Sequence, residues 1–190
     1  MRFLALERTV PPAALPVTEQ EFVDHARLNG LTVDRQPDLI KRELAAATMR
    51  AERYLRRSIM TQTLKGFWGL ENNESDGMLL LPRGHVQSVT TVGNVAGTTI
   101  IDPSGYVLTR NLITLSYPAY TPMAVVWVSG YGDDPADVPD SIREGILEYA
   151  TILYCDRMGA REPKFAAGGE TKLPRGIQDL WRGEQIEVSG

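Results

Sequence analysis

The middle of the chain, residues 59–137, is the stretch that most restricts the fold. Short runs rich in β-branched and aromatic residues follow one another there, and glycine, proline or asparagine interrupts them. This alternation predicts a small antiparallel β lobe of about five to seven strands, because each interruption favours a turn. We expect strands at residues 61–68, 78–81, 86–92, 98–101, 106–109, 112–115 and 124–129.

Segments with helical periodicity flank this region on both sides. The run from Thr18 to Glu21 has the spacing of a capping box, in which each of these two side chains accepts a hydrogen bond from the other residue's amide. Apolar spacing predicts a second helix over Gln36–Arg57 and a third over Pro139–Met158. The β lobe is therefore predicted to be inserted into a small helical bundle with three main helices.

The sequence predicts an extended arm at each end of the chain. Pro11, Pro12 and Pro16 lack amide donors and disfavour a helix before them, so the first segment is either loose or ordered against a neighbouring subunit. The last segment is rich in glycine and charge, with room for one helical turn. The predicted fold class is α+β, with an N-terminal arm (1–17), a helical core (18–58 and 138–159), an inserted β lobe (59–137) and a C-terminal tail (160–190).

Composition narrows the function classes. A hydrophobic fraction of 43% and a charged fraction of 23% are typical of a globular domain. The net charge of −4 argues against a protein whose whole surface grips nucleic acid. No apolar run approaches the roughly 20 residues that span a bilayer, so no membrane partner is expected. The single cysteine, Cys155, cannot form an internal disulfide, which fits a reducing cytoplasm.

Side chains that could carry chemistry are sparse. His25 and His85 have no ligand-spaced partners around them, so we predict no metal site. Cys155 lies in a predicted helix and is interpreted as a buried, inert thiol. The phosphate-binding patterns G-x-x-x-x-G-K-[ST] and G-x-G-x-x-G are missing, as is the nucleophile pattern G-x-S-x-G. We therefore predict no catalytic residues, no cofactor and no enzymatic activity.

Two clusters of charged residues remain as candidate binding sites. The acids Asp133, Asp134, Asp137 and Asp140 lack the alternating spacing of a calcium loop, and we interpret them as turn and helix-start residues. Four arginines gather at the end of the second predicted helix: Arg50, Arg53, Arg56 and Arg57. They suit intersubunit ion pairs or plain solvation, and they could also contact DNA phosphates. No interleaved aromatic residues favour base stacking.

The order of short motifs along the chain carries a resemblance. It runs through Ala51-Glu52-Arg53-Tyr54-Leu55-Arg56-Arg57, Thr61-Gln62-Thr63-Leu64, Leu80-Leu81-Pro82-Arg83, Val125-Val126-Trp127-Val128-Ser129-Gly130-Tyr131-Gly132 and Leu173-Pro174-Arg175-Gly176-Ile177-Gln178-Asp179-Leu180. From Pro16 to Leu180 this order resembles the head-to-tail connector (adaptor, or head-completion) proteins of tailed bacteriophages and related gene-transfer particles. The arm before Pro16, the 66–77 loop and the end after Trp181 do not match.

The resemblance implies a structural virion protein at the head-tail junction, assembled in the host cytoplasm. Its expected partners are the portal protein, a downstream tail or neck protein, further copies of itself in a ring, expected to be a dodecamer, and viral double-stranded DNA in transient contact along the exit channel. In such families the C-terminal tail commonly reaches the portal. The alternatives are another neck or tail-completion ring component (a stopper or tail terminator) and a small nucleic-acid-binding module.

Within that resemblance, the C-terminal tail is the predicted portal-binding or partner-binding segment. Its apolar residues stand out from polar surroundings, and tryptophan is a frequent hot-spot residue at interfaces. The predicted anchors are Leu173, Pro174, Ile177, Leu180 and Trp181. The alternative is that these side chains pack back onto the helices of their own subunit.

Overall fold

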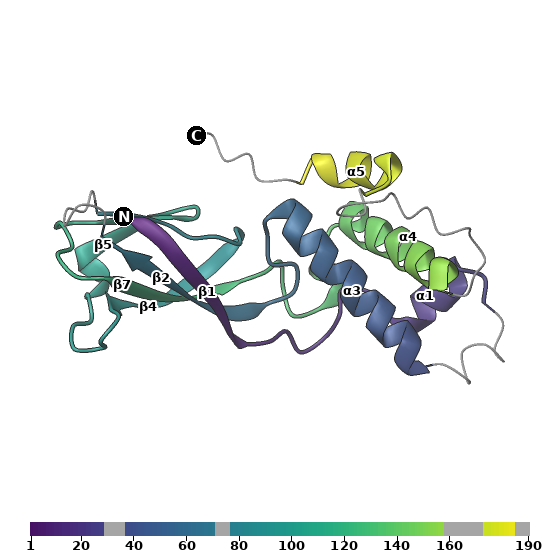
Figure 1. Cartoon of the computed structure of the whole chain (residues 1–190), viewed down its shortest axis with the longest axis horizontal. Helices are drawn as coiled ribbons and strands as arrows, with labels where there is room; N and C mark the ends of the chain where they lie inside the picture. The colour runs from purple at the N-terminus through teal and green to yellow at the C-terminus, as the bar shows by residue number, and fades with distance from the viewer. Residues whose placement is uncertain (29–36, 71–76, 158–172, 185–190) are drawn as a thin grey trace. The chain divides into compact units, whose positions relative to one another are not determined.

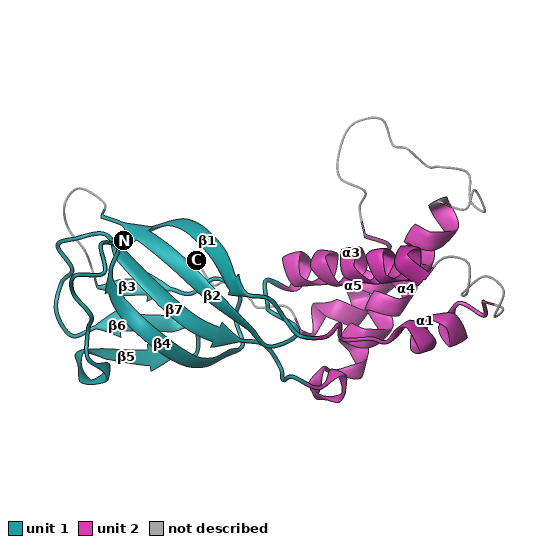
Figure 2. Cartoon of the chain, turned by 90° about the horizontal axis from the view of Figure 1, so that it is seen from below, with its two compact units in different colours: residues 1–13, 56–133 teal, residues 14–55, 134–190 magenta. Residues whose placement is uncertain are grey.

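The chain folds into two units, each of which combines segments that are far apart in the sequence (Figure 2). In this computed structural model, unit 1 comprises Met1–Ala13 and Arg56–Asp133, and unit 2 comprises Ala14–Leu55 and Asp134–Gly190. The structure describes residues 1–28, 37–70, 77–157 and 173–184. Unit 1 contains the strands and unit 2 the α-helices, which confirms the predicted α+β class (Figure 1).

Unit 1 is built from two antiparallel sheets. The four-stranded sheet has the order β1-β2-β7-β4, formed by Arg2–Val10, Gln62–Gly69, Met123–Ser129 and Val86–Asn94. The three-stranded sheet has the order β3-β6-β5, formed by Met78–Leu80, Leu112–Leu115 and Tyr106–Thr109. A short 3-10 turn, η1 (Pro103–Gly105), precedes β5.

The core of unit 1 lies on one face of the larger sheet. Strand β2 alternates strictly between buried and half-buried residues, as a strand with one covered face should. Leu64 of β2 pairs with Trp127 of β7, and Gly66 lies between Trp68 and Trp127. A Cβ at Gly66 would lie 2.5 Å from the Trp68 ring and 3.0 Å from the Trp127 ring, so glycine allows both indoles to cover the strand.

Unit 2 contains four α-helices among the described residues, α1 (Glu19–His25), α3 (Pro37–Leu55), α4 (Asp140–Arg157) and α5 (Arg175–Arg182), and the 3-10 turn η2 (Pro135–Asp137). Helix α4 packs against the other three. The predicted capping box is confirmed: the Thr18 amide donates to the Glu21 carboxylate at 2.7 Å, and the Glu21 amide donates to the Thr18 hydroxyl at 3.1 Å. Ile40 and Leu44 of α3 and Ile142 and Ile146 of α4 are fully buried.

The structure differs from the sequence predictions at several points. Residues 1–17 are not one arm, because Arg2–Val10 is strand β1 of the larger sheet; the prolines follow this strand and do not interrupt it. Residues 98–101 contribute only an isolated bridge, Gly93 to Ile100, where a strand was predicted. The inserted lobe occupies Arg56–Asp133 and not 59–137. Helix α5 spans two turns where one was predicted.

Some predictions fall outside the described residues. They are the end of the third helix at Met158, half of the 66–77 loop (71–76), and the parts of the 160–190 tail that precede Leu173 or follow Glu184. Within the described part of the chain, no helix is long and apolar enough to cross a membrane.

Candidate interaction surfaces

Three of the five predicted tail anchors are buried in their own unit. Leu173, Ile177 and Trp181 turn inward, and the Trp181 side chain has no exposed surface. The Trp181 indole donates to the Ile142 carbonyl at 3.3 Å and lies 5.8 Å from the Tyr54 ring, measured between ring centroids. The structure therefore follows the alternative, packing onto the subunit's own helices, for these three residues.

A glycine in α4 makes this packing possible. A Cβ at Gly145 would overlap the Trp181 indole, so the ring lies directly over the backbone of α4. The opposite face of α5 is exposed and polar, and it carries Arg175, Asp179 and Arg182. Of the remaining predicted anchors, Pro174 is exposed and Leu180 is half-buried. A partner approaching α5 from outside would meet this polar face and not the tryptophan.

The four arginines are divided between the two units. Arg50 and Arg53 belong to α3 of unit 2, whereas Arg56 and Arg57 belong to unit 1. Arg53 and Arg56 are exposed. Arg57 is half-buried, and its guanidinium donates to the Tyr131 hydroxyl at 3.1 Å. The arginines that remain accessible for an ion pair or a phosphate are thus chiefly Arg53 and Arg56.

Arg56 also has an unusual backbone. Its φ of 54° lies in the left-handed region, which glycine or asparagine usually fills after a helix. The Gly84 amide donates to the Arg56 carbonyl at 3.1 Å, and a parallel bridge joins Arg57 to Gly84. These bonds hold the chain in the turn that ends α3 and begins unit 1.

The histidines and acids have structural partners. The His85 ring stacks 4.2 Å from the Tyr131 ring, and its Nδ1 lies 3.0 Å from the Gly130 carbonyl oxygen. His25 Nδ1 lies 3.8 Å from the Glu144 carboxylate. Among the residues that the structure describes, no group of three or more His, Cys, Asp or Glu side chains could hold a metal ion.

The acidic residues before α4 accept backbone hydrogen bonds in a turn, as predicted for Asp134 and Asp137. The Asp134 carboxylate accepts from the Ala136 amide at 2.8 Å, and the Asp137 carboxylate accepts from the Asp134 amide at 3.2 Å. Asp133 and Asp140 are exposed.

Cys155 is half-buried, where the sequence predicts a buried thiol.

A polar network ties α1 to α4. The Arg143 guanidinium bonds to the Glu21 carboxylate and donates to the Pro16 carbonyl at 3.1 Å. Burial alone would raise the pKa of the Glu21 carboxyl, but hydrogen bonds from the Thr18 amide and hydroxyl and the charge of Arg143 outweigh it. The pKa of Glu21 therefore lies below its ordinary value, and the carboxylate stays ionised in this network.

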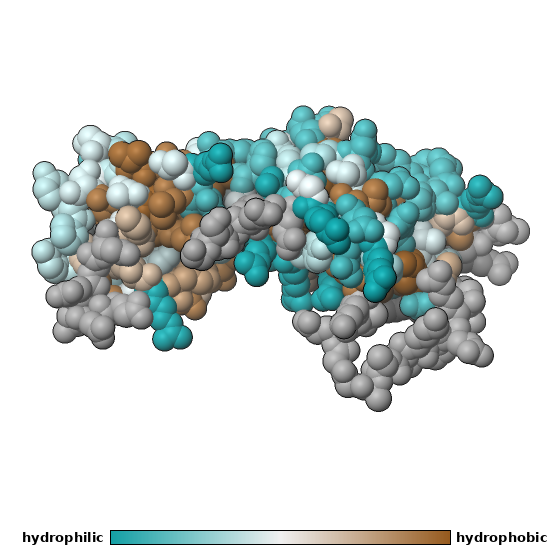
Figure 3. Space-filling view, turned by 90° about the horizontal axis from the view of Figure 1, so that it is seen from above, coloured by the Kyte–Doolittle hydropathy of each residue, from teal (hydrophilic) through white to brown (hydrophobic). Residues whose placement is uncertain are grey.

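Sequence reasoning missed the apolar surface of unit 1. Among the described residues, eleven of the twelve large hydrophobic side chains that are exposed belong to this unit. They are Phe3, Leu4, Leu6, Val10, Met78, Leu80, Val95, Ile100, Val107, Tyr117 and Tyr120. Figure 3 shows the hydrophobic colour gathered over unit 1 on this face of the molecule. Apolar patches of this kind often mark protein–protein contacts.

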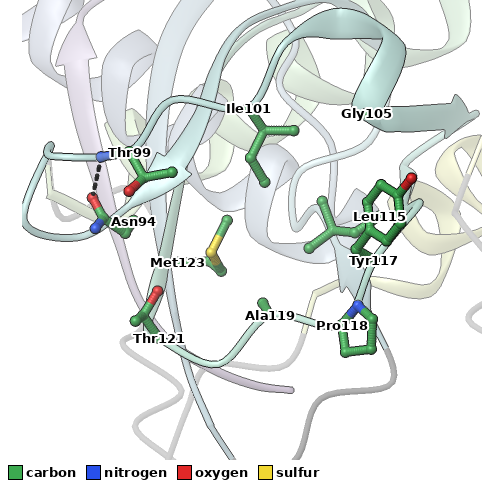
Figure 4. A pocket seen from close by; sticks show the side chains of 10 residues that line it. All are labelled: Asn94, Thr99, Ile101, Gly105, Leu115, Tyr117, Pro118, Ala119, Thr121 and Met123. Carbon is green, nitrogen blue, oxygen red and sulfur yellow. Dashed lines mark hydrogen bonds between the residues drawn. The ribbon is translucent and has the colours of Figure 1, made fainter.

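A cavity of about 280 Å³ opens in the same unit (Figure 4). Its walls are mainly apolar, from Ile101, Leu115, Tyr117, Pro118, Ala119 and Met123. The polar side chain of Asn94 is engaged with the adjacent turn, where its oxygen accepts from the Thr98 and Thr99 amides at 2.9 and 3.1 Å. No short motif contains these residues, because four separate stretches of the chain supply them.

The chain shares its fold with chains of gene transfer agent (GTA) particles. One, in the neck of an empty GTA particle computed with C6 symmetry, is 18% identical with a TM-score of 0.70. Another, in the virion of a native GTA particle, is 18% identical with a TM-score of 0.72. A third, in the neck of a native GTA particle computed with C12 symmetry, is 20% identical with a TM-score of 0.68. Each comparison covers 98% of both chains.

No family model matches the sequence, and no curated protein is similar to it in sequence. At identities near 20%, the structural similarity shows a common fold. It covers 98% of the chain, so both the β unit and the helical unit belong to the common fold.

Proposed function

We propose that the chain is a structural subunit of the neck of a phage-like particle, where copies form a ring between the portal of the head and the tail. The observation that carries this proposal is the common fold with chains of GTA virions and necks over 98% of each chain. Two of those structures are necks computed with cyclic symmetry, which is consistent with many copies around one axis. The motif order within Pro16–Leu180 points in the same direction.

The surface of unit 1 supports an assembly role. A subunit of a closed ring needs two different, complementary surfaces, because each copy contacts its two neighbours through opposite sides. The concentration of exposed apolar side chains on unit 1 provides surface for such contacts. The described side chains form no metal cluster, and their histidines and acids serve turns, caps and ring stacking. We accordingly propose no catalytic activity.

The adaptor position directly under the portal is the finer part of the proposal. We assign portal contact to the exposed face of α5 around Pro174, with Arg175 and Arg182 as charged contacts, while the buried anchors hold the helix in place. Arg53 and Arg56 are the exposed members of the arginine group. They are the proposed partners of a neighbouring subunit's acids or of DNA phosphates in the channel.

Cryo-electron microscopy of the purified protein mixed with portal tests this function. The expected result is a ring of copies seated on the portal, with α5 at the contact. A ring that binds a downstream tail protein but ignores the portal would favour a stopper or tail terminator instead. A protein that stays monomeric with either partner, at concentrations well above those of assembly reactions, would contradict the proposal.

A further inference from the structure

Strand β1 leaves an apolar edge of the larger sheet uncovered. It bonds to β2 along one side, and no described strand pairs with its other side. All nine residues of β1 are exposed, and Leu4 is the most exposed of its large apolar residues, at 59%. Natural sheets usually shorten, charge or cover such edges, because a bare edge recruits another chain. The apolar run Phe3–Leu6 on this exposed edge strand therefore indicates a docking surface.

The apolar cavity lies at the opposite edge of the same sheet. Residues 99–101 run beside the edge strand β4, where the Ile101 amide donates to the Val92 carbonyl at 2.8 Å. Gly93 permits this approach, because a Cβ there would lie 2.5 Å from the Thr99 carbonyl oxygen. Ile101 and Thr99 then form one wall of the cavity (Figure 4). Its volume, about 280 Å³, lies just below the usual range for small-molecule sites and suits apolar side chains.

The directions of the strands fit a repeated arrangement. Neighbours in the order β1-β2-β7-β4 are all antiparallel, so the two edge strands run in opposite directions. A second copy in the same orientation would thus bring its β1 antiparallel to β4 of the first, with residues 99–101 between the two strands at the cavity end. This contact joins two different surfaces, and repetition about an axis closes a ring.

Charge complements the apolar match. Asp102 follows Ile101 at the cavity wall and is fully exposed, and its carboxylate accepts from the Ser104 amide and hydroxyl at 3.0 and 2.8 Å. These hydrogen bonds lower the pKa of Asp102 and keep the carboxylate negative. On β1, the exposed Arg2 lies two residues before Leu4. A positive charge beside the apolar strand thus matches a negative charge beside the cavity.

We propose that β1 of one copy docks at the cavity of the next copy, with Leu4 covering the cavity and Arg2 facing Asp102. The occupant is a second copy of this chain, because the two surfaces complement each other in apolar character and charge and lie on opposite edges of one sheet. The proposal deepens the proposed function by naming the ring contact, and it rests on that function only for the number of copies.

Cysteine trapping with full-length protein tests the contact. Leu4→Cys and Thr121→Cys are made separately in a Cys155→Ser background, since both sites are exposed and Thr121 lines the cavity. Mild oxidation of the mixed variants should give a disulfide-linked pair that neither variant gives alone. Self-linking of the Leu4→Cys protein would overturn the proposal in favour of β1 pairing with β1, and an absence of any linked pair would overturn it outright.

Met49 supplies a matched control. Its side chain is 49% exposed and is the one large exposed hydrophobic residue among those described in unit 2. Met49→Cys mixed with Thr121→Cys should give no linked pair. Equal linking in this control would mean that the trap reports random collisions, and the docking would then be rejected.

Charge reversal gives an independent readout. Arg2→Glu and Asp102→Arg should each weaken self-association roughly tenfold in sedimentation velocity, because each places like charges together. The Arg2→Glu/Asp102→Arg double variant should recover most of that loss. A double variant that associates no better than either single variant would overturn the Arg2–Asp102 contact.

The results separate this contact from the proposed function. Rings on the portal without trapping between Leu4→Cys and Thr121→Cys would reject the docking and leave the neck function standing. Trapping and charge recovery without any binding to portal or tail proteins would support the docking and count against the neck function.

Discussion

Unit 1 and unit 2 differ in how far they bury their large apolar side chains. Unit 2 covers its core with α5, whose apolar face is buried and whose polar face is exposed. Unit 1 buries two tryptophans between its sheets and still leaves eleven large apolar side chains exposed among the described residues. A helical unit can close on itself with one added helix, whereas an open sheet keeps two edges. Substitutions in unit 2 should therefore affect stability first, and substitutions on the surface of unit 1 should affect assembly first.

The largest effect on stability is expected for Trp181→Ala in unit 2. The indole is fully buried and bonds to the Ile142 carbonyl, so its loss leaves a cavity and removes this hydrogen bond. We expect a loss of about 3–5 kcal/mol in the free energy of unfolding of this unit. Urea denaturation measures it, with the exposed Arg182→Ala as control. A change below about 0.5 kcal/mol would mean that α5 leaves its site and offers Trp181 to a partner.

The core of unit 1 should be sensitive at a single glycine. Gly66→Ala would place a methyl group against the Trp68 and Trp127 rings, which must then shift. Overpacking of this kind costs about 1–3 kcal/mol, and near-ultraviolet circular dichroism should register the change around the indoles. If both the spectrum and the melting temperature stay unchanged, the two tryptophans pack less tightly than the structure indicates.

Gly176→Ala should act in the opposite direction. Gly176 lies in the first turn of α5, and a Cβ there would meet nothing within 4 Å. Alanine favours the helix over glycine by up to about 1 kcal/mol, so the free energy of unfolding of unit 2 should rise. Thermal unfolding against wild type measures the gain. A loss of stability would indicate that this face of α5 is covered.

The smallest expected effect is the loss of stability at low pH that comes from Glu21. The pKa of Glu21 is lower in the folded chain than its ordinary value of 4.5, so its ion pair with Arg143 stabilises the fold fully above that value. Stability is then lost as the pH falls below 4.5 through the lower, folded pKa. Because the carboxylate is more than a third exposed, the contribution is under about 1 kcal/mol.

Glu21→Gln should flatten the acid limb of the stability profile of unit 2, measured by urea unfolding between about pH 3 and pH 6. Glu19→Gln, on the same helix, is the control. An identical acid limb in Glu21→Gln and wild type would place the proton uptake elsewhere.

Local signals predicted the local parts of the fold. The capping box located the start of α1, and the strands Tyr106–Thr109 and Leu112–Leu115 have the predicted bounds. Strand β1 was not predicted for two reasons. Three nearby prolines favoured an extended arm, and its partner strand β2 lies more than fifty residues away. Pairings at that separation leave no periodic trace in a single sequence.

The candidate surfaces were harder to predict for the same reason. Apolar residues on a polar tail suit a partner or the chain's own helices equally well, and only the position of Gly145 opposite Trp181 decides between them. The cavity combines residues from four stretches, and each stretch by itself has the composition of a turn. The exposed Ile100, Tyr117 and Tyr120 were the available signal, because large apolar residues are uncommon in turns.

The interleaving of the two units has a consequence for the order of folding during synthesis. Unit 1 is complete once Asp133 has been made, whereas α1 and α3 of unit 2 must wait for α4. Strand β1 must wait for β2, and then pairs across a long loop, a slow step because distant segments must first meet. A ribosome-bound chain should thus form its sheet while α1 and α3 still lack α4. Pauses in translation before residue 140 would prolong the exposure of their apolar faces.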